Sequence, residues 1–331
     1  MVKKVAVLGS GSWATALVKI FSDSRISVTW VVRSEQQVDF IRNNGYNPKY
    51  LSSAALNMKF VTVCSYDNVS YDDTELVIFA IPSAFLSATI SEIDPQALTG
   101  KRLAVSIKGF VPRTGLTPTS FVQNYFDTDE PVIVIGGPCH AEEIASGKSS
   151  YLTVGGTEPL FVSELSASLH TSYLRIISSN DPRGIEYAAI LKNIIGIAGG
   201  IASGLNYGDN FQAVLVSNAM YEISVFLEST CDGNRGRNLF DSAYFGDLLV
   251  TAYSDYSRNR VLGKLVGRGI PIGKALAGME MIAEGFHASH EFAPIIKKLN
   301  LSMPVTNTVY RILHQHANPY HEFKLLEQKL N

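Results

Sequence analysis

The sequence predicts an α/β protein in which a doubly wound, mostly parallel sheet is followed by an all-α C-terminal domain. Up to about residue 180, short apolar runs alternate with helix-like stretches, a pattern typical of parallel strands joined by crossover helices. Beyond that point apolar residues recur with a period of about 3.6, as in "FQAVLVSNAMYEISVFLEST" (211–230). A length of 331 residues, 46% of them hydrophobic, is enough for two domains.

The expected strands are rich in β-branched residues and apolar on both faces, as strands buried in a parallel sheet should be. In chain order they are Lys3–Gly9, Ile26–Val32, Lys59–Val63, Glu75–Ile81, Arg102–Lys108, Pro131–Gly137, and residues 149–155 and 173–178. The "NDPRG" cluster at 180–184 then indicates a boundary, because Asn, Asp, Pro and Gly interrupt regular structure. We expect a first domain over residues 1–180 and a helical domain over 181–331.

Charge and cysteine content exclude several classes of function. The 28 Lys and Arg residues against 30 Asp and Glu residues leave a net charge of -2, with no basic excess for nucleic acid or an anionic membrane surface. Cys64, Cys139 and Cys231 are widely spaced and form no CxxC, so neither a zinc site nor a disulfide framework is indicated. The N-terminal apolar run is too short for a signal peptide, and we expect a cytoplasmic protein.

A glycine motif follows the first expected strand and opens a helix. In "GSGSWATAL" (9–17), Gly9 permits a tight turn, Gly11 lets the backbone approach a pyrophosphate, and Ala14 keeps the helix close to the strand. This is the GxGxxG/A arrangement of a Rossmann-like dinucleotide-binding domain. We expect cofactor contacts from Gly9, Gly11, Ser12, Trp13 and Ala14. The alternative is a tight strand-to-helix turn that binds nothing.

The end of the second strand indicates which dinucleotide is bound. An acidic residue there would bind the ribose hydroxyl of NAD, but the sequence reads "VVRSEQQ". Arg33 could pair with the 2′-phosphate of NADP, whereas Glu35 keeps NAD possible. The expected cofactor is therefore NADP or NAD, and Arg33 could also be an ordinary surface arginine.

A single charge interrupts the apolar run "YAAILKNIIGIAGGIA" (187–202). An ammonium group in a buried helix must reach solvent along its own stem, find a partner, or lose its proton to do chemistry. Lys192 has no acidic residue at the i±4 positions of its own helix, so a local ion pair is excluded. Lys192 is a candidate catalytic residue.

Ordered motifs along nearly the whole chain resemble the bacterial NAD(P)-dependent glycerol-3-phosphate dehydrogenases. Besides the glycine motif they are "NPKYL" (47–51), "AIPS" (80–83), "SIKG" (106–109), "GGPCHAEEIA" (136–145), "GIEYAAILKNIIGIAGG" (184–200), "GDLLVT" (246–251), "SRNR" (257–260), "IAEGF" (282–286) and "MPVTNTVYRIL" (303–313). The resemblance implies reduction of dihydroxyacetone phosphate to sn-glycerol 3-phosphate, with supply of phospholipid synthesis and a homodimer formed through the helical half.

The same resemblance assigns the reacting groups. It implies that Lys192 is the catalytic lysine, that Lys108 is a second cation, and that Asp247 orients Lys192 and the substrate hydroxyl. Hydride transfer to a ketone develops an alkoxide that must be stabilised and protonated, which a lysine can do. Burial and Lys108 would each lower the pKa of Lys192. Asp247 could also be a helix N-cap.

Further residues are assigned by resemblance alone. It implies substrate contacts from Lys108, Gly137, Cys139, Asn193, Asp247, Thr251, Ser257, Arg258 and Asn259, the last three at the phosphate. It implies cofactor contacts from Lys108, Ala141, Arg258, Ile282 and Glu284. No metal site is expected, although His287 and His290 lie three residues apart on an expected helix beside Glu291.

Three departures from the family and two other functions remain open. "YLSSAAL" and "SAYFGDL" replace proline-glycine and glycine-rich stretches, and Asn218 stands where an arginine is common. The alternatives are a related two-domain reductase of a non-phosphorylated keto or hydroxy acid, which would have less need of Ser257, Arg258 and Asn259, and a non-catalytic NADPH-sensing protein.

Overall fold

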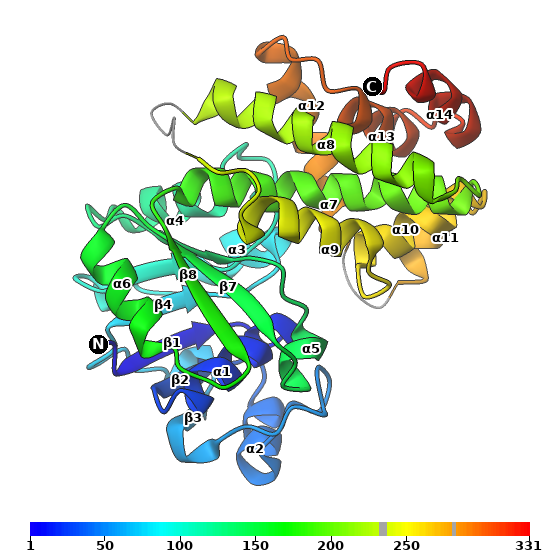
Figure 1. The fold of residues 1–331 in the computed structure, drawn as a ribbon. Coiled ribbons are helices and arrows are strands. Elements are labelled where there is room, and N and C mark those ends of the chain that lie inside the picture. Colours follow the sequence, from blue (N-terminus) through cyan, green and yellow to red (C-terminus); the bar gives the residue numbers. More distant parts are fainter. Residues whose placement is uncertain (232–236, 280–282) are drawn as a thin grey trace. The chain divides into compact units, whose positions relative to one another are not determined.

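The computed structural model describes residues 1–231, 237–279 and 283–331 (Figure 1). The chain divides into two compact units. The first contains Met1–Ile107 and Leu116–Pro182, and the second contains Lys108–Gly115 and Arg183–Asn331. Residues 108–115 therefore follow directly from the first unit in sequence but pack with the helices of the second.

The first unit is built on an eight-stranded sheet with the order β3-β2-β1-β4-β5-β6-β7-β8. All neighbouring strands are parallel except β6 and β7, which are antiparallel. The strands are β1 (Lys4–Leu8), β2 (Ser27–Val31), β3 (Val61–Cys64), β4 (Leu76–Phe79), β5 (Arg102–Val105), β6 (Ile133–Gly136), β7 (Ser150–Gly155) and β8 (Leu174–Ser179). The predicted mostly parallel sheet is confirmed, but β5 ends three residues earlier than expected, so Ser106, Ile107 and Lys108 lie beyond it.

Helices cover this sheet because its strands are apolar on both faces. Residues Val5 to Leu8 of β1 are fully buried, and β1 pairs with β2 on one side and β4 on the other. The helices are α1 (Ser12–Asp23), α2 (Glu35–Asn44), α3 (Ser83–Ile90), α4 (Pro118–Phe126), α5 (Ala141–Ala145) and α6 (Pro159–Ser168). The turn that follows β1 lies at the carboxyl ends of the parallel strands, where the strand order reverses between β1 and β4. Doubly wound folds bind ligands at this position.

The second unit is helical, and no strand occurs in its described part, as predicted. Its helices are α7 (Pro182–Gly204), α8 (Asp209–Thr230), α9 (Asp247–Tyr253), α10 (Arg258–Gly267), α11 (Ile272–Ala277), α12 (Glu284–Lys298), α13 (Pro304–His314) and α14 (Pro319–Glu327). Among the described helices, α7 alone is long and apolar enough to cross a membrane, but 94% of its apolar window is buried inside the structure. These surroundings are those of a core helix.

Helices α7 and α10 pack with their backbones in direct contact. A Cβ added to Gly200 would overlap the carbonyl oxygen of Arg260, and a Cβ added to Gly263 would overlap the carbonyl oxygen of Ile197. Glycine is required on both helices of this crossing because an added Cβ would overlap a backbone atom, and a backbone atom cannot move aside as the end of a flexible side chain can. The crossing fixes the start of α10 beside the C-terminal half of α7.

Gly263→Ala is expected to destabilise the protein by about 3 kcal/mol or more, because relief of the backbone overlap requires the two helices to separate. The measurement is the free energy of unfolding from urea denaturation. Gly273→Ala in α11 is the matched control, because its Cβ would meet nothing within 4 Å. It should change stability by no more than about 1 kcal/mol. Equal stabilities of the two variants would contradict the close crossing.

Candidate active site

The glycine turn after β1 has the geometry of a pyrophosphate site. Gly9 has a φ of +135°, and an added Cβ would overlap the carbonyl oxygen of Ala80, so only glycine fits there. Gly11 precedes the first turn of α1, and a Cβ added to it would meet no atom within 4 Å. The space beside Gly11 and the N-terminus of a twelve-residue helix together suit an anionic group. The residues present therefore fit a dinucleotide.

Several hydrogen bonds fix this turn. The Trp30 indole N–H donates to the carbonyl oxygen of Gly9 at 2.7 Å, and the Gly9 N–H donates to that of Val31 at 3.0 Å. The buried Asn47 amide donates to the Ser10 carbonyl at 3.0 Å and to Thr15 Oγ1 at 2.8 Å. Asn47 belongs to the "NPKYL" motif, whose role the sequence alone left open.

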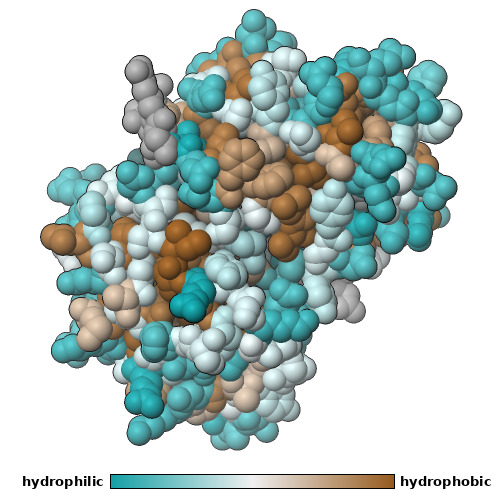
Figure 2. All heavy atoms as spheres, in the orientation of Figure 1, coloured by the Kyte–Doolittle hydropathy of each residue, from teal (hydrophilic) through white to brown (hydrophobic). Residues whose placement is uncertain are grey.

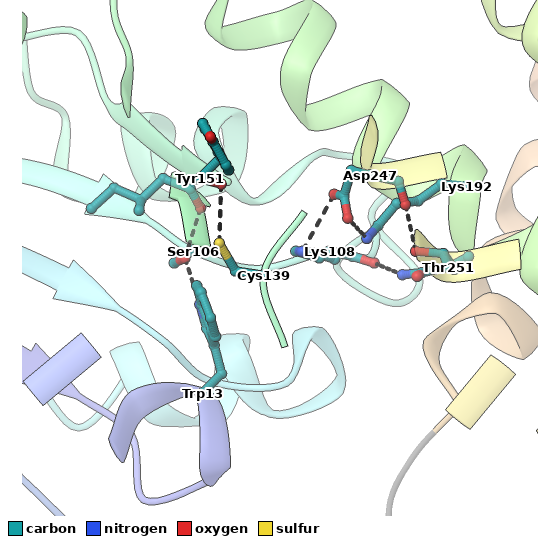
Figure 3. Close-up of polar contacts among 10 residues, drawn as sticks. Trp13, Ser106, Lys108, Cys139, Tyr151, Lys192, Asp247 and Thr251 are labelled. Carbon is teal, nitrogen blue, oxygen red and sulfur yellow. Dashed lines mark hydrogen bonds and ion pairs between the residues drawn. The ribbon is translucent and has the colours of Figure 1, made fainter. Parts of the chain in front are cut away.

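Trp13 is anchored by a relay within the first unit (Figure 3). Its indole N–H donates to Ser106 Oγ at 2.7 Å, and the Ser106 hydroxyl donates to the Ile135 carbonyl oxygen at 2.7 Å. Ser106 lies just beyond β5, so the relay joins the glycine motif to the ends of β5 and β6. Sequence reasoning missed Ser106, although "SIKG" contains it.

The "GGPCHA" loop is held against β7. Gly137 has a φ of +122°, and its added Cβ would lie 2.8 Å from the Tyr151 carbonyl oxygen. The Cys139 thiol donates to the same oxygen at 3.0 Å, as Figure 3 shows. Cys139 is thus a buried loop residue, and Ala141 begins α5 directly after the loop.

Two cations and one carboxylate meet inside the second unit (Figure 3). The Lys192 ammonium on α7 donates a hydrogen bond to Asp247 Oδ1, and the Lys108 ammonium lies 3.4 Å from Asp247 Oδ2. Lys192 and Asp247 are 5% and 1% exposed. Lys192 therefore does not extend to solvent along its stem; its partner comes from a helix 55 residues further along the chain.

Asp247 is the first residue of α9 and follows a π-helical turn, Ser242–Gly246. Its carboxylate binds the two lysines, so the alternative role of helix N-cap does not hold. The turn is formed by the "SAYFG" stretch, which is expected from sequence to differ from the resembled family. π-Helical turns reorient the residues that follow them and often occur at functional sites.

The electrostatics favour proton transfer at Lys192. Burial lowers the pKa of Lys192 to about 7, and the neighbouring Lys108 ammonium acts in the same direction, while Asp247 opposes both. A lysine with this pKa can both hold and release a proton near neutral pH.

Three of the predicted substrate residues make internal hydrogen bonds around this cluster. The Asn193 amide donates to the Lys108 carbonyl oxygen at 2.8 Å, the Thr251 hydroxyl donates to the Asp247 carbonyl oxygen at 2.7 Å, and Asn259 Oδ1 accepts from the Gly285 N–H at 2.9 Å. The first bond links α7 to the segment that begins at Lys108, the second lies within α9, and the third links α10 to the start of α12.

The start of α10 presents further polar groups. Ser257 is its N-cap and accepts a hydrogen bond from the Arg260 N–H at 3.3 Å, and Arg258 is exposed at the first helical position. Glu284 begins α12, and Ile282, also predicted at the cofactor site, lies outside the described residues. His287 and His290 are exposed on α12. Within the described ranges, no group of three or more His, Cys, Asp and Glu side chains is arranged to hold a metal ion.

Residues that would meet the adenosine end of a dinucleotide follow β2 and β3. Arg33 is exposed after β2. Glu35 starts α2, and its Oε1 accepts hydrogen bonds from the Ser65 hydroxyl and, at 2.9 Å, from the Asn68 amide. The sequence placed Glu35 at this end of the sheet but did not indicate these partners.

Comparison with protein families accounts for both units. Residues 4–161 match the family described as NAD-dependent glycerol-3-phosphate dehydrogenase N-terminus, and residues 181–324 match the corresponding C-terminus. Together these matches cover most of the chain.

Individual relatives agree with the family match. The chain is 31% identical to a glycerol-3-phosphate dehydrogenase [NAD(P)+] of Clostridium botulinum (strain Eklund 17B), over 98% of both chains. It is 35% identical to one of Brachyspira hyodysenteriae, over 95% of this chain and 93% of the relative. The crystal structure of glycerol-3-phosphate dehydrogenase from Coxiella burnetii has a TM-score of 0.90 at 26% identity, and the match covers 98% of each chain.

Proposed function

Because this chain belongs to the NAD-dependent glycerol-3-phosphate dehydrogenase family, we propose that it reduces dihydroxyacetone phosphate reversibly to sn-glycerol 3-phosphate with NADPH or NADH. The observation that carries this proposal is the buried cluster of Lys192, Lys108 and Asp247. Ketone reduction needs a proton donor, and a cationic donor of near-neutral pKa such as Lys192 can also stabilise the developing alkoxide. A protein that only sensed NADPH would have no use for it.

Three residues of the buried cluster have separate roles in the reduction. Bound NAD(P)H supplies the hydride, which adds to the ketone carbon. The carbon–oxygen π electrons move to the oxygen, and the Lys192 ammonium stabilises this alkoxide and then gives it a proton, becoming a neutral amine. Asp247 orients Lys192, and the Lys108 ammonium adds positive charge to the same site.

Binding is assigned to residues of both units. The substrate phosphate is bound by Ser257, Arg258 and Asn259 at the start of α10, where a hydroxyl, a guanidinium and helix N–H groups favour a dianion. The remaining substrate and cofactor contacts are those that the family resemblance implies. Residues 1–180 form the cofactor-binding domain, apart from Lys108–Gly115, which pack with the second unit, and residues 181–331 form the substrate-binding and catalytic domain. The enzyme acts in the cytoplasm and supplies phospholipid synthesis.

The enzyme is a homodimer joined through its helical half. An apolar groove of about 420 Å³ lies between α8 on one side and α9 with the segment leading into it on the other. Its walls include Tyr221, Phe240 and Tyr253, which are 67%, 78% and 43% exposed. Figure 2 shows apolar side chains gathered on this face. A surface of this kind is costly to leave in water, and a second copy would cover it. Sedimentation analysis tests this proposal. The wild type should be a dimer, and Phe240→Asp, which places a charge in the groove, should weaken the dimer. A monomeric wild type would contradict the proposal.

The reaction is tested by following NADPH oxidation with dihydroxyacetone phosphate and, separately, with unphosphorylated dihydroxyacetone. Turnover should require the phosphate, and Arg258→Met should raise the KM of the phosphorylated ketone. Turnover of a keto acid instead would identify a reductase of non-phosphorylated acids. Binding of NADPH with no turnover of any ketone would point to the sensing protein.

The pKa of Lys192 predicts a pH dependence for both directions. The ammonium is needed for reduction, so kcat/KM for dihydroxyacetone phosphate should fall about tenfold per pH unit above pH 7. Oxidation needs the neutral amine, so kcat/KM for glycerol 3-phosphate should rise up to about pH 7 and then level off. Profiles measured in both directions check this. A reduction rate that stays constant to pH 10 would contradict it.

A further inference from the structure

The Glu35 carboxylate is the acidic group that could decide which dinucleotide binds. Arg33 and Glu35 follow the end of β2, the strand whose end faces the adenosine ribose in doubly wound folds. A ribose 2′-hydroxyl is best bound by a carboxylate, whereas a 2′-phosphate needs a cation and is repelled by a carboxylate. Both kinds of side chain are present here, two residues apart.

The structure shows where Glu35 is held. Strand β2 lies between β1, which carries the glycine turn, and β3. Val31 and Cys64 are paired at the ends of β2 and β3, so Ser65 and Asn68 lie directly beside the start of α2. Both donate hydrogen bonds to Glu35 Oε1, and Asn68 also donates to Ser65 Oγ at 3.1 Å. The carboxylate is therefore fixed on the β3 side of β2, opposite the glycine turn.

Burial and charge agree with a fixed arrangement. Ser65 is 4% exposed, so its hydroxyl is held in place by the packing around it. The two hydrogen bonds lower the pKa of Glu35, and the carboxylate stays ionised in this position. Arg33, by contrast, is exposed, and none of the ion pairs in the described part of the chain includes it.

We propose that Ser65 and Asn68 determine cofactor specificity: by holding Glu35 on the β3 side of β2, they leave Arg33 as the charge that meets the 2′ position, so that NADPH is preferred over NADH. This inference rests on the proposed function only in taking the ligand to be a nicotinamide dinucleotide. It assigns a role to two residues outside the glycine motif.

The test compares four proteins: wild type, Glu35→Gln, Ser65→Ala/Asn68→Ala, and the triple variant that combines all three changes. The Kd values of NADPH and NADH are measured by fluorescence without any ketone, and kcat/KM is measured with dihydroxyacetone phosphate. The double variant should bind NADPH about tenfold more weakly, because the released carboxylate repels the 2′-phosphate. NADH binding should be unchanged or tighter, and the triple variant should recover NADPH binding.

A purely structural role gives a different pattern. If Ser65 and Asn68 only support the loop, both cofactors weaken equally and Glu35→Gln restores neither. That result, or a wild type that prefers NADH, overturns the inference. Ser70→Ala, which removes a hydroxyl from the same loop, should leave both Kd values unchanged. NADPH-selective binding without turnover would contradict the proposed function and leave this inference standing, whereas failure to bind either cofactor overturns it.

Discussion

Lys192→Met is expected to lower kcat for dihydroxyacetone phosphate reduction by about 10³-fold or more while the Kd of NADPH stays within about threefold of the wild type. Methionine keeps an apolar stem of similar size but removes both the positive charge that stabilises the alkoxide and the proton that the alkoxide needs. Loss of one preorganised electrostatic group costs about 10²–10³ in rate, and loss of general acid catalysis costs about 10²–10⁴. Steady-state kinetics and NADPH fluorescence measure the two quantities.

Two further variants separate chemistry from folding. Lys192→Arg keeps the charge but replaces the ammonium by a guanidinium that hardly gives up a proton, so it should also be strongly impaired. Lys297→Met, at an exposed position of α12, should have wild-type activity. Thermal melting curves establish that each variant is folded. A fully active Lys192→Arg enzyme would remove the proton-donor role and leave the electrostatic one.

The sheet could be predicted from sequence because its pattern is local. Buried parallel strands are apolar on both faces over a few residues, and a glycine turn after the first strand indicates what that strand leads into. The helical half is equally local in its period. The predicted end of β5 was wrong for a local reason too. Ser106, Ile107 and Lys108 continue the sequence pattern of the strand, but the pairing with neighbouring strands stops at Val105.

The pairings at the candidate site could not be predicted in this way. Lys192 and Asp247 are 55 residues apart and meet through helix packing. That packing needs a close approach of α7 and α9, where a Cβ added to Gly196 would lie 2.8 Å from the side chain of Thr251. Isolated glycines in helical sequence usually indicate lower stability, and they do not indicate which helix will approach. The lysine itself was conspicuous only because burial of an unpaired charge is so unfavourable.

Hydrogen-bonded residues around the site were missed for a related reason. Ser106 and Asn47 are small polar residues in apolar or loop sequence, and nothing in the neighbouring sequence indicates their hydrogen-bond partners. Glu35 was seen as a possible ribose ligand, but its contacts with Ser65 and Asn68 come from pairing of β2 with β3, about thirty residues later. Which way a side chain points is decided by such tertiary neighbours.

Asp247→Asn is expected to lower kcat by about 10²-fold and to shift its dependence on pH. Asparagine has nearly the same shape but no charge, so the two ammonium groups of Lys108 and Lys192 would face each other without a carboxylate between them. Since Asp247 is what raises the pKa of Lys192 against burial, its removal should take that pKa below 7. Lys192 would then be mostly neutral at pH 7 and unable to protonate the alkoxide.

The distinguishing measurement is the pH profile of kcat/KM for dihydroxyacetone phosphate. The fall in activity above neutral pH should begin at a lower pH in Asp247→Asn than in the wild type, and acidification should restore part of the lost rate. Asp241→Asn, an exposed aspartate ahead of the π-helical turn, should keep the wild-type profile. An unshifted profile with a uniformly lower rate would mean that Asp247 positions Lys192 without controlling its charge, because orientation alone lowers the rate equally at every pH.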